Sequence, residues 1–134
     1  MNEILIFPDR IILYESIIFL YKSNNYFDVV AELLVDGFLL IGRNGKEIYI
    51  KDFVFLGNIL SVAISIFEGR VEYVRGMYDN FNSNYLNCYK DTIGFFKSTF
   101  GSKGYSRKVD FYDYSIKIIY DTRLNGVMWI IYIK

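Results

Sequence analysis

Residues 26–52 read YFDVVAELLVDGFLLIGRNGKEIYIKD and contain the clearest turn signals of the chain. Asp36-Gly37 and Asn44-Gly45 are dipeptides that favour positive φ angles, as the tightest β-hairpin turns require. They separate three apolar-rich segments, residues 27–35, 38–43 and 46–51, and in the last of these Ile48 and Ile50 alternate with more polar neighbours. The pattern predicts a three-stranded meander.

Long apolar segments flank this block on both sides. Residues 53–67, FVFLGNILSVAISIF, carry no charge, and their length favours a core helix that begins after Asp52 and stops at Gly69. Residues 10–22 are apolar on almost every side, so their length favours a buried helix with Asp9 near its N-cap, while their isoleucine content leaves a strand open. Residues 3–7 fit a short strand that ends before Pro8.

The second half of the chain carries one helical stripe and a closing hairpin. Aromatic and aliphatic residues recur at intervals of three and four, and the stripe ends at Gly101: Tyr78, Phe81, Tyr85, Tyr89, Ile93, Phe96 and Phe100. Residues 70–76 fit either a short strand or a continued helix, and residues 101–106 fit a loop. Residues 109–120 and 127–133 are β-rich and form the predicted hairpin. We therefore expect one α+β domain over residues 1–134, an antiparallel sheet of hairpins with two or three helices packed on one face.

The composition removes most catalytic chemistry. The 134 residues include 15 Lys plus Arg, 15 Asp plus Glu, one cysteine and no histidine. A net charge of zero argues against a dedicated nucleic-acid binder. Disulfide scaffolds, Ser-His-Asp triads, Cys-His dyads and histidine-based metal sites all need residues that this chain lacks. We therefore expect a protein that is not an enzyme and that uses no metal and no cofactor.

The remaining candidate residues do not fit a phosphate-binding or catalytic site, because of their spacing or their missing partners. Gly42–Lys46 and Gly101–Gly104 place glycines beside a lysine, but neither has the spacing of a phosphate-binding P-loop. Asp110 and Asp113 would point to opposite faces of a strand, so they cannot act as a carboxylate pair. Cys88 has no histidine to activate it and fits a structural role.

Aromatic residues make up 19% of the chain and hydrophobic residues 53%, so part of the apolar surface must stay exposed and a protein partner or a homodimer would cover it. Residues 73–89 mix tyrosine with asparagine, serine and single charges, a mixture that suits protein recognition, although the same spacing also suits a core stripe. Residues 110–114 are a second candidate. The predicted partner-binding residues are Tyr78, Asp79, Asn82, Tyr85, Tyr112 and Asp113.

The sequence also predicts the cellular compartment of the protein. No uncharged apolar stretch reaches the roughly 20 residues of a membrane span, and the first residues lack the basic start of a signal peptide. With a single thiol, the reducing cytoplasm is the expected location.

In size, in the hairpin-rich block 27–52 followed by the helix expected over 53–67, and in its missing catalytic chemistry, the chain resembles the small bacterial immunity proteins of contact-dependent growth inhibition and other polymorphic toxin systems. The resemblance implies a cytoplasmic α+β domain that binds a cognate toxin domain and blocks it, with no direct contact to nucleic acid or membrane. Two alternatives stay open: a phage- or host-encoded inhibitor of another protein complex, and an α+β domain that binds a small molecule.

Overall fold

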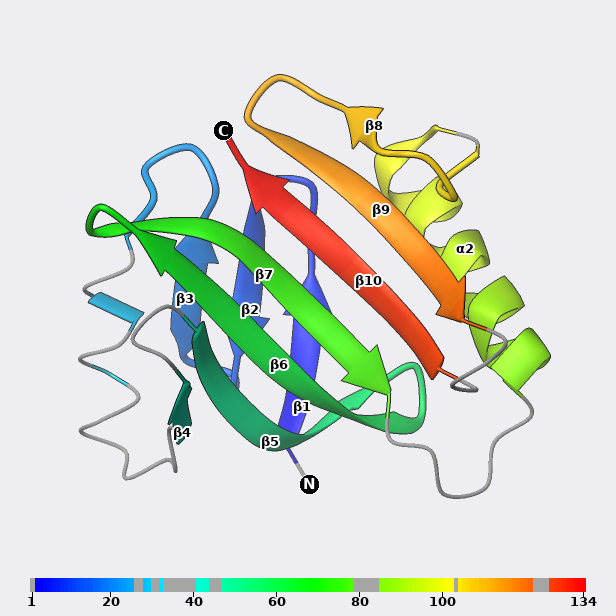
Figure 1. Cartoon of the computed structure of the whole chain (residues 1–134), viewed down its shortest axis with the longest axis horizontal. Coiled ribbons are helices and arrows are strands. Elements are labelled where there is room, and N and C mark those ends of the chain that lie inside the picture. Colours follow the sequence, from blue (N-terminus) through cyan, green and yellow to red (C-terminus); the bar gives the residue numbers. More distant parts are fainter. Residues whose placement is uncertain are drawn as a thin grey trace.

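The fold is dominated by one curved, mixed β-sheet (Figure 1). The computed structural model describes residues 2–25, 28–29, 32, 41–43, 47–78, 85–102, 104–121 and 126–134. Its elements are β1 (Asn2–Ile6), β2 (Arg10–Leu13), β3 (Ile17–Leu20), β4 (Ile41–Arg43), β5 (Glu47–Phe55), β6 (Asn58–Phe67), β7 (Arg70–Tyr78), α2 (Tyr85–Phe100), β8 (Val109–Asp110), β9 (Tyr114–Asp121) and β10 (Gly126–Ile133).

Ten strands among the described residues pair in the order β3-β2-β1-β5-β6-β7-β10-β9-β8, and β4 pairs with β5 outside this path. Every pairing is antiparallel except that of β1 with β5. Strands β1, β2 and β3 form a ribbon that lies behind β5, β6, β7 and β10 in Figure 1. The sheet therefore folds back on itself, and its inner face is the face turned toward the ribbon.

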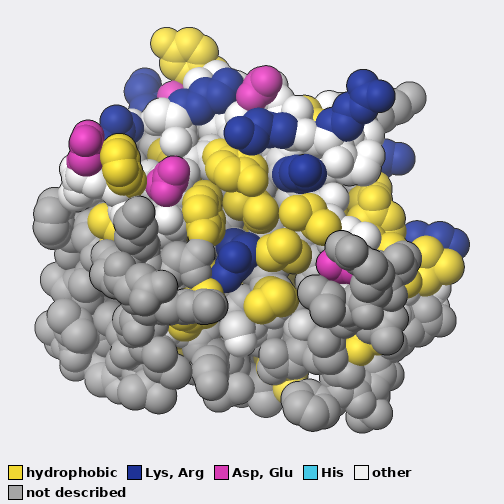
Figure 2. Space-filling view, in the orientation of Figure 1, with side chains coloured by type: hydrophobic (Ala, Val, Ile, Leu, Met, Phe, Trp, Pro, Cys, Tyr) yellow, Lys and Arg dark blue, Asp and Glu magenta, His cyan; other side chains and the backbone are white. Residues whose placement is uncertain are grey.

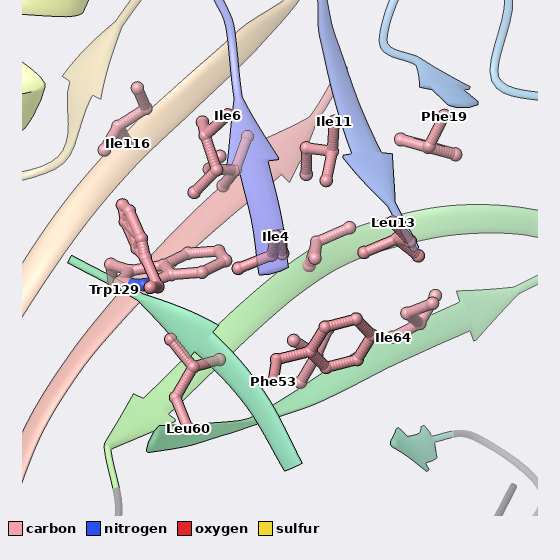
Figure 3. Close-up of a cluster of buried hydrophobic side chains, with 14 of the residues drawn as sticks. Ile4, Ile6, Ile11, Leu13, Phe19, Phe53, Leu60, Ile64, Ile116 and Trp129 are labelled. Carbon is pink, nitrogen blue, oxygen red and sulfur yellow. The ribbon is translucent and has the colours of Figure 1, made fainter. Parts of the chain in front are cut away.

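A single core fills the space between the ribbon and the rest of the sheet. Ile4 and Leu13 of the ribbon point toward Phe53 and Ile64 of β5 and β6 (Figure 3). The helix α2 covers the other part of the inner face, where fully buried Phe96 lies 6.5 Å from Phe55, centroid to centroid. Ribbon and helix thus share the inner face, and neither lies on the outer face.

The tightest packing in this core joins β7 to β10. Trp129 of β10 pairs with Gly76 of β7, and both residues face inward. A Cβ atom on Gly76 would overlap the indole ring, so only glycine leaves the space that the ring occupies. The Trp129 centroid also lies 5.9 Å from that of Phe55 and 6.2 Å from that of Phe96, which links the sheet to α2.

The prediction of a helix over residues 53–67 is wrong. Residues 53–55 complete β5, the turn at Leu56 and Gly57 has φ angles of 52° and 74°, and residues 58–67 form β6. Both faces of β6 are buried in its middle, because Ala63 and Ser65 on the outer face are only 2% and 4% exposed, although no other described element packs there, while Leu60 and its alternate neighbours fill the core. A strand buried on both faces loses the apolar–polar alternation that marks strands, so its sequence resembles that of a buried helix.

Residues 10–22 form a second hairpin and not the expected helix, so the strand alternative was correct. Strands β2 and β3 join through a turn in which Tyr14 and Glu15 have φ angles of 53° and 68°. Their burial alternates, with Ile11, Leu13, Ile17 and Phe19 inward. The tertiary core supplies the energy that holds two non-glycine residues in the left-handed region.

The expected fold class, an antiparallel sheet with two or three packed helices, is therefore wrong. The structure is a mixed ten-stranded sheet, and α2 is the one long helix among the described residues. Of the strand expected over 27–35, the described residues 28, 29 and 32 are helical. The Asp36-Gly37 and Asn44-Gly45 turns lie outside the described residues, yet the pairing of Arg43 with Glu47 confirms the hairpin that joins β4 to β5.

Other expectations are confirmed. The part of the stripe from Tyr85 to Phe100 forms α2, and Gly101 ends the helix with a φ of 83°, whereas Tyr78 lies in β7 and Phe81 lies outside the described residues. Residues 70–78 form β7, the strand alternative for that region. Strands β9 and β10 form the closing hairpin, paired from Tyr114 with Ile133 to Asp121 with Gly126.

We predict opposite effects for alanine at two glycines. Gly76→Ala forces Trp129 out of its position and lowers the free energy of unfolding by about 1–3 kcal/mol or more. Gly94→Ala, the matched control, places its methyl group in open space on α2 and raises stability by up to about 1 kcal/mol, since alanine is the better helix former. Urea denaturation followed by circular dichroism measures both. A Gly76→Ala variant as stable as wild type would contradict the close packing of Gly76 against Trp129.

Candidate functional site

The partner-binding residues predicted from sequence do not form one surface. Tyr78 is buried at the end of β7, and its hydroxyl lies 2.9 Å from the hydroxyl of Thr92 on α2. Thr92 in turn donates to the main-chain carbonyl of Cys88 at 2.8 Å. Burial raises the pKa of Tyr78, and the hydrogen bond with Thr92 opposes that rise. Tyr78 therefore serves the contact between sheet and helix.

The other described members of the set lie apart. Tyr112 is 93% exposed in the turn before β9, and the main-chain carbonyl of neighbouring Asp113 accepts a hydrogen bond from the Lys134 N–H at 2.9 Å. Tyr85 is half-buried at the start of α2, which lies near the opposite end of β9 because Tyr89 stacks on Tyr120 (Figure 1). The eight residues of β9 separate these sites by about 26 Å. Asp79 and Asn82 lie outside the described residues.

The face of the sheet that neither ribbon nor helix covers offers a more coherent surface. Strand register arranges the outward side chains of β6, β7, β10 and β9 in three rows, which we call the outer grid: Ser61, Met77, Met128 and Ile119; Ala63, Arg75, Ile130 and Lys117; Ser65, Tyr73, Tyr132 and Ser115. In Figure 2 hydrophobic side chains gather at the centre of this view, and lysine and arginine side chains lie along its upper margin.

Charge is sparse in the outer grid. Its two charged residues, Arg75 and Lys117, are both basic and both half-buried. Met77 is 43% exposed, and Tyr73 and Tyr132 are partly exposed. The tyrosine, methionine and arginine of the outer grid are types that are enriched at the centres of protein interfaces, whereas its serine, alanine and lysine are types that are depleted there.

Contacts within the sheet hold the large side chains of the outer grid in place. The Arg75 Nη2 atom donates to the Tyr49 hydroxyl at 3.1 Å. The rings of Tyr73 and Tyr132 lie 6.0 Å apart in an edge-on arrangement, and the Lys108 ammonium sits 4.1 Å from the centre of the Tyr132 ring. Side chains that are already ordered lose less conformational entropy when a partner binds.

The border of the outer grid is polar. Asp110 accepts a hydrogen bond from Ser115, and its carboxylate lies 3.5 Å from the Lys134 ammonium. The hydrogen bond from Ser115 and the charge of Lys134 together lower the pKa of Asp110. A charged border around an apolar centre matches the rim of a protein interface.

Part of this surface is within a segment that the sequence indicates for protein recognition, but the sequence leaves residues 70–76 open between a strand and a continued helix. Tyr73 and Arg75 fall within residues 73–89, the segment singled out for protein recognition, yet their neighbours were read at helical spacing. On a strand, every second residue shares a face, so Tyr73, Arg75 and Met77 project together. Their companions on β10 are more than fifty positions away in sequence, and only the pairing of β7 with β10 brings them together.

The described residues contain no group of three or more acidic or cysteine side chains that could hold a metal ion. Within the same residues, no helix combines the length and apolar character needed to cross a membrane. Comparison with protein-family models, with curated proteins and with solved structures finds no match to the chain. Its function must therefore be inferred from its own residues.

We predict that Tyr78 and Tyr112 differ sharply in their contribution to stability. Tyr78→Phe removes the hydrogen bond to Thr92 and lowers the free energy of unfolding by about 1 kcal/mol. Tyr112→Ala removes an exposed ring and changes stability by less than about 0.5 kcal/mol. Thermal unfolding of the two variants checks this order, and equal destabilisation would contradict the placement of Tyr78 in the core.

We also predict a loss of stability at alkaline pH. Burial is the largest cause of a raised pKa at Tyr21, Tyr78, Tyr105 and Tyr114. In the unfolded chain these phenols ionise near their usual pKa of about 10, whereas in the folded chain they stay protonated to higher pH. The unfolded state then binds fewer protons, so stability is intact below about pH 10 and falls as the pH rises beyond it. Tyrosinate absorbance should show these tyrosines ionising only with unfolding, and one smooth titration of all thirteen in the folded protein would contradict this.

Proposed function

We propose that this chain is a non-enzymatic domain that binds a protein partner through the outer grid and blocks the partner surface that it covers. The observation that carries the proposal is the outer face of β6, β7, β10 and β9, which no other element among the described residues covers and where tyrosine, methionine and arginine are held in fixed rows with few charges. Such residues dominate binding energy where they are desolvated at the centre of an interface.

The charges of the outer grid indicate the chemistry of the partner. Arg75 and Lys117 are its charged members, and Lys108 adds a third basic group beside Tyr132. Of the acidic residues at its border, Glu72 accepts a hydrogen bond from Ser65 at 3.0 Å, and Asp110 interacts with Ser115 and Lys134. Electrostatic potentials across an interface are complementary, so basic groups on one side favour acidic groups on the other. The partner surface should therefore be largely apolar and carry carboxylates that lie opposite Arg75 and Lys117.

A second copy of this chain fits the outer grid less well than an acidic partner. A homodimer through this face would bring two sets of the basic pair Arg75 and Lys117 into one interface. Like charges in an interface oppose association, and their cost must be offset by other contacts. The homodimer is therefore an outcome that the experiment below can detect, and the heteromeric complex is our proposal.

We propose a toxin domain as the partner, as for the immunity proteins that the chain resembles. One of the three supports for that resemblance, the helix over residues 53–67, is replaced by the hairpin of β5 and β6. The size and the absence of histidine remain. An inhibitor of another protein complex would use the same surface. We place the interaction in the cytoplasm, since the single buried cysteine is suited to a reducing compartment.

The test uses two lysine substitutions at exposed apolar residues. Met77→Lys adds a charge to the outer grid, whereas Leu86→Lys makes the same kind of change on α2, and the two parent side chains are 43% and 48% exposed. Wild-type protein is first used to capture a stoichiometric partner from lysate through a high-salt wash. We expect Met77→Lys to weaken binding of that partner at least about tenfold and Leu86→Lys to leave it unchanged.

Three outcomes would contradict the proposal. Capture of no protein by wild type would argue against a protein partner, and equal binding by both variants would place the interface elsewhere. The third outcome is a homodimer: light scattering would find that wild-type protein without any partner is dimeric and that Met77→Lys is monomeric. The outer grid would then be a homodimer interface.

A further inference from the structure

The two edges of strand β1 are paired with neighbouring strands over different lengths. Along one edge β1 pairs with β2 as far as Ile6 with Ile11. Along the other edge its pairing with β5 stops at Glu3 with Val54. Beyond that point no strand among the described residues lies against β1, because β5 ends at Phe55 and the turn at Leu56 and Gly57 leads away into β6.

The backbone polarity of this open edge follows from the pairing with β2. The Phe7 N–H donates to the Arg10 carbonyl at 2.8 Å, so the odd-numbered residues of β1 direct their N–H and C=O groups toward β2. The even-numbered residues point the other way. The carbonyl of Ile4 and both backbone groups of Ile6 therefore lie on the edge that β5 leaves open.

An apolar cleft adjoins this edge. It has a volume of about 300 Å³ and lies between residues 3–7 of β1, residues 54–57 of the β5–β6 hairpin and Phe95 of α2. The large apolar side chains at its walls include Leu5 and Leu56, each 41% exposed. Among the described residues, Glu3 is the one charged residue that lines the cleft.

The terminal edge of the same sheet, at β3, is capped by a side chain. At β3 the side chain of Asn25 takes the place of a neighbouring strand, since the Leu20 N–H donates to its Oδ1 atom at 2.8 Å and its Nδ2 atom donates to the Ile18 carbonyl at 2.9 Å. Proteins commonly block exposed edges because open edges recruit other strands. The edge of β1 beside the cleft has no such block among the described residues.

We infer that this cleft binds an extended segment of a partner protein, which adds to the open edge of β1 as a short strand. Its backbone pairs with Ile4 and Ile6, its apolar side chains fill the space beside Leu56 and Phe95, and a lysine or arginine pairs with Glu3. This is recognition by strand addition, in which main-chain hydrogen bonds give affinity and alternate side chains give specificity. The cleft lies on the ribbon and helix side of the sheet, so the inference does not depend on the outer grid.

The experiment selects ligands for the full chain from a phage-displayed library of random peptides. We expect enriched peptides to alternate apolar residues and to carry one basic residue. Glu3→Lys should shift that position to Asp or Glu, whereas the control Glu68→Lys, an exposed turn residue between β6 and β7, should leave the basic preference intact. Leu56→Lys, which places a charge at the cleft wall, should weaken the selected peptides at least about tenfold.

Synthetic peptides test the strand geometry itself. N-methylation at alternate residues should abolish binding, while N-methylation at the intervening residues should be tolerated, since only one set of N–H groups faces β1. The Ile6 amide should exchange with solvent at least about tenfold more slowly in the complex.

Three results would overturn the inference: no enrichment over a library selected without protein, binding that tolerates N-methylation at every residue, or binding that both Glu3→Lys and Leu56→Lys leave unchanged. Met77→Lys separates this site from the outer grid. That variant should retain peptide binding, so either site can fail without the other.

Discussion

The contact between Trp129 and Gly76 sets the arrangement of the rest of the molecule. It lies where β7 meets β10, the pairing that joins the first half of the sheet to the C-terminal hairpin. Because glycine leaves room for the whole indole ring, the two strands pair closely while the largest side chain of the chain points inward. The ring then supports Phe55 and Phe96, which bring α2 onto the same face. One side chain thus directs both strand pairing and helix packing to the inner face.

The packing of the ribbon and the helix on the same face determines which surfaces the described residues leave uncovered. The ribbon of β1, β2 and β3 and the helix α2 both pack there, so the described residues leave the outer face of β6, β7, β10 and β9 without a covering layer (Figure 1). Pairing of β1 with β5 stops at Glu3, since β5 ends at Phe55 and turns into β6, and the cleft beside Phe95 lies there.

Part of this fold could be predicted from sequence, and the reasons for failure are physical. The aromatic stripe over 85–100 is amphipathic, with Cys88, Thr92 and Phe96 buried and its other face exposed, so its period was readable. The hairpin of β9 and β10 has β-rich segments on both sides of a turn. In contrast, β6 is buried on both faces in its middle, and the turns at Leu56-Gly57 and Glu68-Gly69 begin with residues that seldom take positive φ. Local sequence therefore gave no sign that residues 53–67 span a turn and two strands.

By itself, the sequence determined the chemistry open to this protein. With no histidine and one cysteine, it excludes histidine-based catalytic and metal sites, and its thirteen tyrosines and twelve phenylalanines supply side chains suited to contacts between proteins. Tertiary structure alone decided which aromatic residues are available for contact. Tyr78 turned inward to Thr92, whereas Tyr73 and Tyr132, far apart in the chain, came together on an open face. That choice depends on strand register and on the space beside Trp129, which are properties of pairings between distant segments and not of any local stretch.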